Sequence, residues 1–432
     1  MAGRRLSSND VSVVIALAIV VLALLLIFIV ERRAGRADES DMAAAVGPRA
    51  EAGASAASPL AAVPSGDAPV ASASASCAAV TVQPVSGETE DGLAARQRDE
   101  AVQAILAALD AHPEPRARAA GLYFRTARDR LEGRVGDICK ERPDECAASE
   151  QRQRDARGSA EALARLAVDS ADAQVYVWAY RSCAAVARET AGSCQLINAL
   201  QWARLDPGNA EPWFAVARGA RSRRDGAGVD DAMFHVAAAS VHDAGWGRLV
   251  EEMVKAASQE DRMLVGTWLA SADAMSYETL DLAVPDLSRY CDARALANAN
   301  RRDTCDKIAA TLVDRSTMLL GRSTGIGLAK KLDWPAARLA AAELERDAAN
   351  ALASRDAPQF GEPTTCANVR NDLSRLIDNA RLGEVEAMKQ RIAATGEPID
   401  ALAAEQRRFI GSVREANAAA AAASAASAAR GT

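Results

Sequence analysis

One uninterrupted apolar run at residues 11–30 constrains this chain more than any other feature. None of its 20 residues carries a charge. A helix rises about 1.5 Å per residue, so the run spans roughly 30 Å, the thickness of a bilayer's hydrocarbon core. We therefore expect a single transmembrane helix at residues 11–30, preceded by a short polar tail at residues 1–10.

The run is too long for the apolar part of a cleaved secretory signal, which has about 7 to 15 residues. A charged Glu-Arg-Arg sequence follows it directly, so we interpret it as a retained signal anchor. Positively charged flanks tend to stay in the cytoplasm. Arg4 and Arg5 before the run nearly balance Arg32, Arg33 and Arg36 after it, so the flanking charges do not decide the orientation.

The rest of the chain divides by composition. Residues 34–91 are rich in Ala, Ser, Pro and Gly, and they contain no periodic apolar pattern, which predicts a disordered linker. A coil of this length spans roughly 40 Å. Residues 92–415 form the predicted α-helical domain, and residues 416–432 form an Ala-rich tail.

The composition and periodicity of the large domain favour an all-α fold. Aromatic residues make up only 4% of the chain and alanine is abundant, which favours close-packed helices over sheets. Apolar residues recur at the i, i+3, i+4, i+7 spacing of one helix face. Such faces begin at Val102, Leu196, Trp213, Val250 and Leu373. Gly and Pro interrupt them at short intervals, so we predict antiparallel helical hairpins in a repeat-like or solenoid arrangement.

The eight cysteines have mostly local spacings. No CxxC sequence occurs, which argues against zinc and iron–sulfur sites. Disulfides that join neighbouring helices are one interpretation, and buried free thiols are the other. We favour disulfides, and hence an oxidising compartment, without fixing the pairing. The candidates are Cys139 and Cys146, Cys183 and Cys194, and Cys291 and Cys305, with Cys77 and Cys366 left over.

A junction between residues 202 and 213 has a recognisable pattern. Leu205-Asp206-Pro207 follows a helical face that contains Trp202, and Trp213 begins the next face. The pattern resembles the junction between tetratricopeptide repeats, and the resemblance covers residues 175–243 only. It implies paired helices that pack through small residues around a concave surface for peptides or proteins. The alternative is an irregular helical domain with one repeat-like hairpin.

Five tryptophans gather in and just beyond this region. They are candidates either for a tight core or for aromatic anchors of a partner-binding groove. They are Trp178, Trp202, Trp213, Trp246 and Trp268.

Two other patterns suggest chemistry at first sight. Gly321, Gly325 and Gly327 resemble the cofactor loop of short-chain dehydrogenases, but no strand–helix alternation follows, so we interpret residues 320–329 as a Gly-rich turn between helices. His235 and His242 have no metal-ligand spacing, and we expect solvent-facing polar residues. We predict no catalytic residues, no metal site and no cofactor.

These observations give one favoured function and two alternatives. We expect a single-pass protein of the bacterial inner membrane, whose periplasmic helical-repeat domain binds an unknown protein or peptide partner. The net charge of −7, without an extended basic face, argues against nucleic acid as the partner. The alternatives are a cell-envelope hydrolase with a helical catalytic domain, and a purely structural spacer or assembly factor.

Overall fold

The computed structural model divides the chain into two compact units, Met1–Ser76 and Cys77–Thr432. All residues that the structure describes lie in the second unit. They are residues 90–132, 143–186, 192–257, 266–268, 270–271, 274, 284–355 and 365–430.

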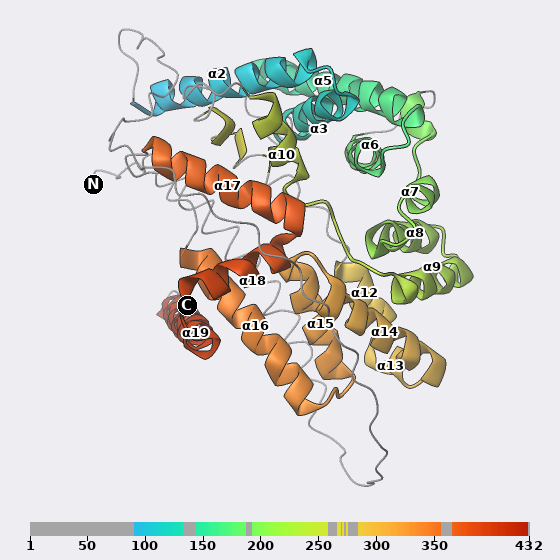
Figure 1. Cartoon of the computed structure of the whole chain (residues 1–432), viewed down its shortest axis with the longest axis vertical. Helices are drawn as coiled ribbons and strands as arrows, with labels where there is room; N and C mark the ends of the chain where they lie inside the picture. Colours follow the sequence, from blue (N-terminus) through green and yellow to red (C-terminus); the bar gives the residue numbers. More distant parts are fainter. Residues whose placement is uncertain are drawn as a thin grey trace, which may run out of the picture. The chain divides into compact units, whose positions relative to one another are not determined.

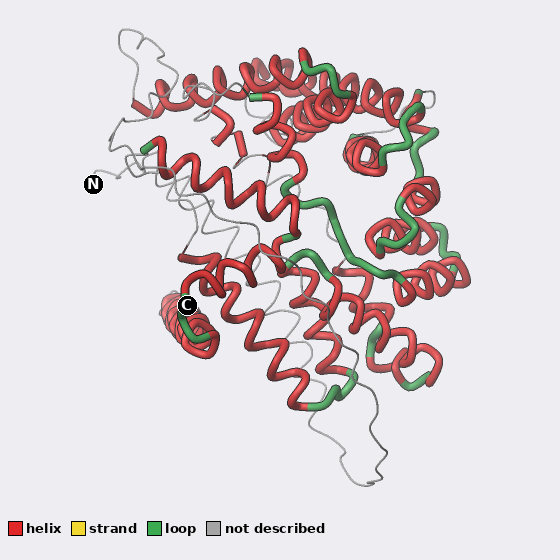
Figure 2. The backbone as a smooth tube through the Cα atoms, in the orientation of Figure 1, coloured by secondary structure: helices red, strands yellow, loops and turns green. Residues whose placement is uncertain are grey.

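The described part of the chain is helical, as the composition predicted, and contains no strand (Figures 1 and 2). The first helices are α2 (Glu90–Ala111), α3 (Pro115–Glu132), α5 (Pro143–Val168), α6 (Ala173–Ala185), the 3-10 helix η1 (Ser193–Gln195), α7 (Ala199–Leu205), α8 (Ala210–Ser222), α9 (Gly226–Ala238) and α10 (Arg248–Ala256). They are followed by α12 (Val284–Tyr290), α13 (Ala293–Leu296), α14 (Ala299–Arg315), α15 (Leu319–Lys331), α16 (Ala336–Arg355), α17 (Cys366–Leu382), α18 (Glu384–Thr395) and α19 (Ile399–Arg430).

Helix boundaries follow the capping chemistry of the sequence. Pro207 lies in the break after α7, and the Asn209 side chain then caps α8 by accepting a hydrogen bond from the Glu211 N–H. Asp225 caps α9 in the same way, from the Gly228 N–H. These caps satisfy backbone donors that a helix start leaves without an intrahelical partner. Helix α8 therefore begins just after Pro207-Gly208 and ends shortly before Gly226, two of the Gly and Pro interruptions in the sequence, and α9 begins at Gly226.

Most helices pack against their neighbours in the sequence. Such neighbouring pairs are α2 and α3, α8 and α9, α14 and α15, and α15 and α16, whereas α9 on α14 and α16 on α19 join helices that are not consecutive. The side chains form two large apolar clusters. The first surrounds Trp178 and includes Ile105 and Leu109 of the predicted α2 face. The second joins α8 and α9 to α14 and α15, around Met233 and Ile308.

Helix α17 departs from this sequential pattern. It packs on α10, and Val369 and Leu373 complete the first apolar cluster, although more than 250 residues separate them from Leu109. The Trp268 Nε1–H donates to the Asp372 Oδ2 atom at 3.0 Å. The Arg381 Nε–H donates to the Glu251 Oε1 atom at 3.3 Å. The first cluster is therefore closed by a helix from the far end of the chain.

Cysteine pairs join neighbouring elements in each cluster. Cys183 of α6 is bonded to Cys194 of η1, and Cys291, next to α12, is bonded to Cys305 of α14. Both pairs fit the expectation of local disulfides. Cys146 and Cys366 are disulfide-bonded as well. Cys77 and Cys139 lie outside the described residues.

Two details of the sequence interpretation are wrong. Of the face predicted to begin at Leu196, Leu196 and Leu200 are exposed, because α7 begins only at Ala199 and turns Trp202 and Ala203, the last residue of that face, into the protein. The glycine-rich segment 320–329 is not a turn but lies inside α15. A Cβ atom at Gly325 would lie 2.7 Å from the Leu312 Cβ atom. Glycine therefore serves there to let α15 approach α14 closely.

Within the described residues, no helix has both the length and the apolar character that a membrane crossing needs. The predicted transmembrane helix at 11–30 and the predicted linker at 34–91, apart from its last two residues, lie outside the described part of the chain.

Candidate functional site

The most elaborate polar arrangement surrounds the extended connection between α9 and α10, which we call the strap (residues 239–247; Figure 2). The strap lies between two helix–helix turns. On one side, the Ala210 N–H donates to the Val241 carbonyl at 2.8 Å. On the other, the His242 N–H donates to the Arg315 carbonyl at 3.1 Å, and the Thr317 N–H donates to the His242 carbonyl at 2.9 Å. The strap thus joins the start of α8 to the turn between α14 and α15.

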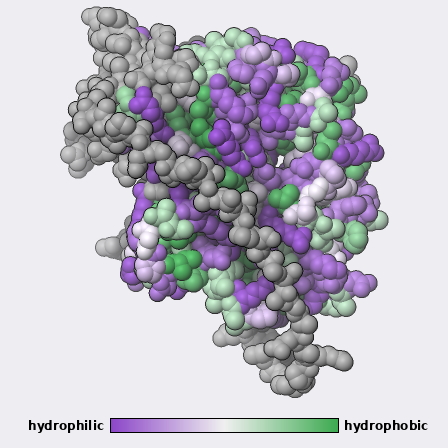
Figure 3. Space-filling model, in the orientation of Figure 1, coloured by the Kyte–Doolittle hydropathy of each residue, from purple (hydrophilic) through white to green (hydrophobic). Residues whose placement is uncertain are grey.

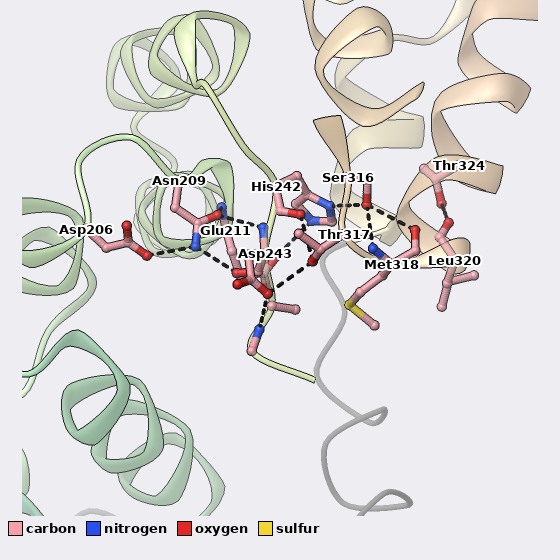
Figure 4. A network of polar contacts seen from close by, with 12 residues as sticks. Asp206, Asn209, Glu211, His242, Asp243, Ser316, Thr317, Met318, Leu320 and Thr324 are labelled. Carbon is pink, nitrogen blue, oxygen red and sulfur yellow. Dashed lines mark hydrogen bonds and ion pairs between the residues drawn. The ribbon is translucent and has the colours of Figure 1, made fainter. Parts of the chain in front are cut away.

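The His242 side chain continues this connection through its ring (Figure 4). Its Nε2 atom lies 3.1 Å from the Glu211 Oε2 atom of α8, and its Nδ1 atom lies 2.9 Å from the Ser316 Oγ atom. All three residues are buried, and the Phe214 ring meets the imidazole edge-on. Carboxylate, imidazole and hydroxyl thus form a continuous chain across three segments that are distant in the sequence.

The charge of Glu211 is stabilised inside the protein. Burial by itself would raise the pKa of this carboxyl group, but the hydrogen bond with His242 and the positive charges of Arg181 and Arg218 lower the pKa below its usual value. A buried carboxylate needs such partners, because an unpaired buried charge is strongly destabilising. With Glu211 ionised, the His242 Nε2 atom is the donor in their hydrogen bond.

Protein atoms surround the Ser316 hydroxyl group. Besides His242, its Oγ atom lies 3.0 Å from the Met318 carbonyl oxygen and accepts from the Met318 N–H at 3.2 Å. Gly321 covers the site from α15: a Cβ atom there would lie 2.7 Å from the His242 Nδ1 atom and closer still to the Ser316 Oγ atom. A carboxylate–imidazole–hydroxyl chain can activate a serine nucleophile. In this geometry Ser316 is buried beneath α15, which argues against access of a substrate to its Oγ atom.

A second set of polar contacts fixes the other edge of the strap (Figure 4). The Asn209 Nδ2–H donates to the Asp243 carbonyl at 2.7 Å, and the Asp243 N–H donates to the Asn209 Oδ1 atom at 2.9 Å. Thr317 donates its hydroxyl to the Asp243 carboxylate at 3.1 Å. The Arg181 Nη2–H of α6 reaches the Ala244 carbonyl at 2.7 Å. The strap is therefore held from α6, α8 and the α14–α15 turn together.

The sequence did not identify this arrangement. The solvent-facing interpretation is wrong for His242, which is 5% exposed. Glu211 lies 31 residues before His242, and Ser316 lies 74 residues after it, so no local spacing signals the three together. The one available signal was the pair Gly321 and Gly325 inside an otherwise helical segment, which indicates close approach of another backbone or side chain.

The five predicted tryptophans do not form one site. Trp178, Trp202 and Trp268 are buried in the first apolar cluster. Trp246 lies in the strap, half-buried. Trp213 of α8 is also half-buried, and its ring stacks on the His235 ring of α9 with centroids 3.9 Å apart.

Phe234, next to His235, extends this stacked pair into a small aromatic surface. Phe234 is 63% exposed, the largest exposed fraction among the large hydrophobic residues of the described part, and its ring meets His235 edge-on. We call Trp213, Phe234 and His235 the aromatic surface. On the face of the molecule seen in Figure 3, hydrophobic residues occur in small groups among hydrophilic ones. Large exposed aromatic side chains of this kind are typical anchors of protein interfaces.

In the described part of the chain, no group of three or more His, Cys, Asp or Glu side chains is arranged to hold a metal ion. Comparison with protein-family models, curated proteins and solved structures finds no match to this chain.

Proposed function

We propose that this chain is a membrane-anchored periplasmic protein of the bacterial cell envelope, whose helical-repeat domain binds a protein or peptide partner and catalyses no reaction. The charge-free run at 11–30 supports the anchor, and the disulfides support an oxidising compartment. The sequential packing of helical hairpins supports a repeat-like domain.

The likeness to tetratricopeptide repeats is best supported at the α8–α9 hairpin. Ala217 and Ala232, the small residues expected between paired helices, are fully buried there. The preceding helix ends at Leu205, before Pro207, as in a repeat junction. Outside this region, the contact of α17 with α10 departs from an array in which each repeat touches only its neighbours.

The observation that carries the binding function is the aromatic surface on this same hairpin. Its Phe234 ring is mostly exposed to water although the hairpin buries Met233 and Val236 within one turn of it. Covering an exposed phenylalanine in a complex removes apolar area from water and contributes on the order of 2 kcal/mol. A partner with an apolar pocket or an aromatic side chain fits this chemistry.

A pull-down from solubilised membranes tests the proposal. We expect wild-type protein to enrich one partner stoichiometrically, and Phe234→Ala with Trp213→Ala to lose it. Phe409→Ala is the matched control, because Phe409 is an exposed phenylalanine (45%) on α19. Equal capture by all variants refutes the aromatic surface as the binding site. Absence of any stoichiometric partner favours a structural spacer or assembly factor.

The location has a separate test. A reporter fused after Thr432 distinguishes the two orientations. Active alkaline phosphatase is the expected result, and a silent phosphatase together with a bright cytoplasmic reporter excludes the periplasmic placement.

The Glu211–His242–Ser316 chain favours one alternative function, a cell-envelope hydrolase. Its donor and acceptor distances suit a serine nucleophile, but the burial of Ser316 and the close approach of Gly321 argue against substrate access. A fluorophosphonate probe, which labels activated serines, separates the two functions. We expect no labelling of native protein. Labelling that disappears in Ser316→Ala identifies a hydrolase.

A further inference from the structure

An arginine side chain covers the Trp334 ring, which lies just before α16. The Arg338 guanidinium group lies over this ring, 3.6 Å from its centroid. The Arg338 Nη2–H donates to the Asp314 Oδ2 atom at 2.7 Å, so an aspartate holds the arginine in place. Beneath this cover Trp334 is only 7% exposed.

The Tyr290 ring at the end of α12 has the same arrangement. The Arg301 guanidinium group lies 4.1 Å from the centroid of this ring, and its Nη2–H donates to the Asp230 Oδ1 atom of α9 at 2.6 Å. Tyr290 is buried beneath it. In both places the face of the ring attracts the cation and the carboxylate orients it. An aromatic ring, an arginine and an aspartate thus form a unit that this fold uses twice.

Helix α9 contains a third ring and a third aspartate without the arginine. Asp231 lies three residues before Phe234, so the two side chains are neighbours on one side of the helix, and both are exposed. In the part of the chain that the structure describes, no arginine or lysine lies over the Phe234 ring, and none is paired with Asp231. Two of the three members of the unit are therefore present.

The charges of the hairpin favour a cation from outside the domain. The exposed Arg223 and Arg224 lie in the α8–α9 turn, and even Gly226, where α9 begins, is roughly 12 Å along the helix axis from Phe234. The charge beside the ring is the carboxylate of Asp231. We propose that the partner places an arginine of its own over the Phe234 ring and against Asp231.

An arginine suits these two side chains better than a lysine. Its planar guanidinium group stacks on an aromatic face and donates two parallel hydrogen bonds to a carboxylate. Its apolar stem also covers ring surface, which removes that surface from water. The partner is thus a protein or peptide with an exposed arginine, and this assignment rests on the proposed function because it requires a partner at the aromatic surface.

Random dodecapeptides displayed on phage, selected on the solubilised full-length protein, test the assignment. Sequences that wild type retains and Phe234→Ala does not are binders of the aromatic surface, and we expect arginine to be enriched among them. If no sequence depends on Phe234, both the arginine and the aromatic surface as a binding site are refuted. If such sequences exist without enrichment of arginine, the arginine alone is refuted and the binding function stands.

Citrulline, which has nearly the shape of arginine but no charge, gives a sharper test. A selected peptide should bind wild type roughly 3- to 30-fold more tightly than its citrulline version, which loses the cation–π contact and the ion pair. The ratio should shrink in Phe234→Leu and in Asp231→Asn. It should persist in the control Asp400→Asn, which removes one exposed negative charge from α19. Equal affinities of the two peptides for wild type, or an unchanged ratio in either of the first two variants, overturn the proposal.

Discussion

Gly321 offers the sharpest test of how the strap is held, because α15 contains its own control. At Gly321 a Cβ atom would lie 2.7 Å from both the Nδ1 and the Cε1 atom of His242, whereas at Gly327 it would meet nothing within 4 Å. Both residues lie inside the same helix, so alanine has the same intrinsic advantage at each. That advantage is about 1 kcal/mol.

The two substitutions should change the free energy of unfolding in opposite directions. Gly327→Ala should stabilise the protein by up to about 1 kcal/mol. Gly321→Ala has the same gain, but overpacking costs about 1–3 kcal/mol, and displacing His242 from Ser316 costs about 1 kcal/mol more for the lost hydrogen bond. The net expectation is a loss of about 1–3 kcal/mol.

Urea denaturation of the full-length protein, followed by helical circular dichroism, measures the difference between the two variants. The midpoint should fall for Gly321→Ala and rise or stay unchanged for Gly327→Ala. If Gly321→Ala is as stable as Gly327→Ala, α15 does not approach His242 closely in solution, and this side of the strap is not held by α15.

Three further perturbations have defined outcomes. The lowered pKa of Glu211 means that its ionised form stabilises the fold above the pKa of about 4.3 of an unfolded chain, and that this contribution is lost as the pH falls through the lower folded value. The stability difference between wild type and Glu211→Gln should therefore be largest near pH 7 and shrink below about pH 4 in urea titrations. Leu402→Ala should cost about 2–5 kcal/mol, because Leu402 is fully buried between α19 and α16, whereas Phe409→Ala on the same helix should change the urea midpoint little. Replacing Cys183 and Cys194 by alanine should cost about 2–4 kcal/mol in unreduced protein and much less relative to wild type after full reduction, which paired melts with and without a reductant would show.

The sequence predicts a helix well where the apolar residues that define it follow one another at helical spacing. The face that begins at Val102 is buried in α2, and the breaks at Pro207 and Gly226 lie on either side of α8. Each of these features depends on residues within about one helix length, so periodicity and capping are enough to find them.

The candidate site could not be found in this way. His242 is buried because three separate segments supply its neighbours, and nothing in the flanking sequence distinguishes it from the half-buried His235. Leu196 and Leu200 show the opposite error: their spacing fits a helix face, but the bond between Cys183 and Cys194 and the cap at Asn198 start the helix after Leu196. In both places, contacts with distant parts of the chain decide which side chains are buried.

The closure of the first cluster by α17 has a consequence for the order of events during synthesis. Val369 and Leu373 belong to the same apolar cluster as residues of α2 that the ribosome adds about 260 positions earlier. At roughly 5–20 residues per second, this interval lasts roughly 10–50 s. Throughout that time the first apolar cluster lacks the helix that completes it. We expect this incomplete cluster, rather than any surface of the finished protein, to be the region that most needs a chaperone.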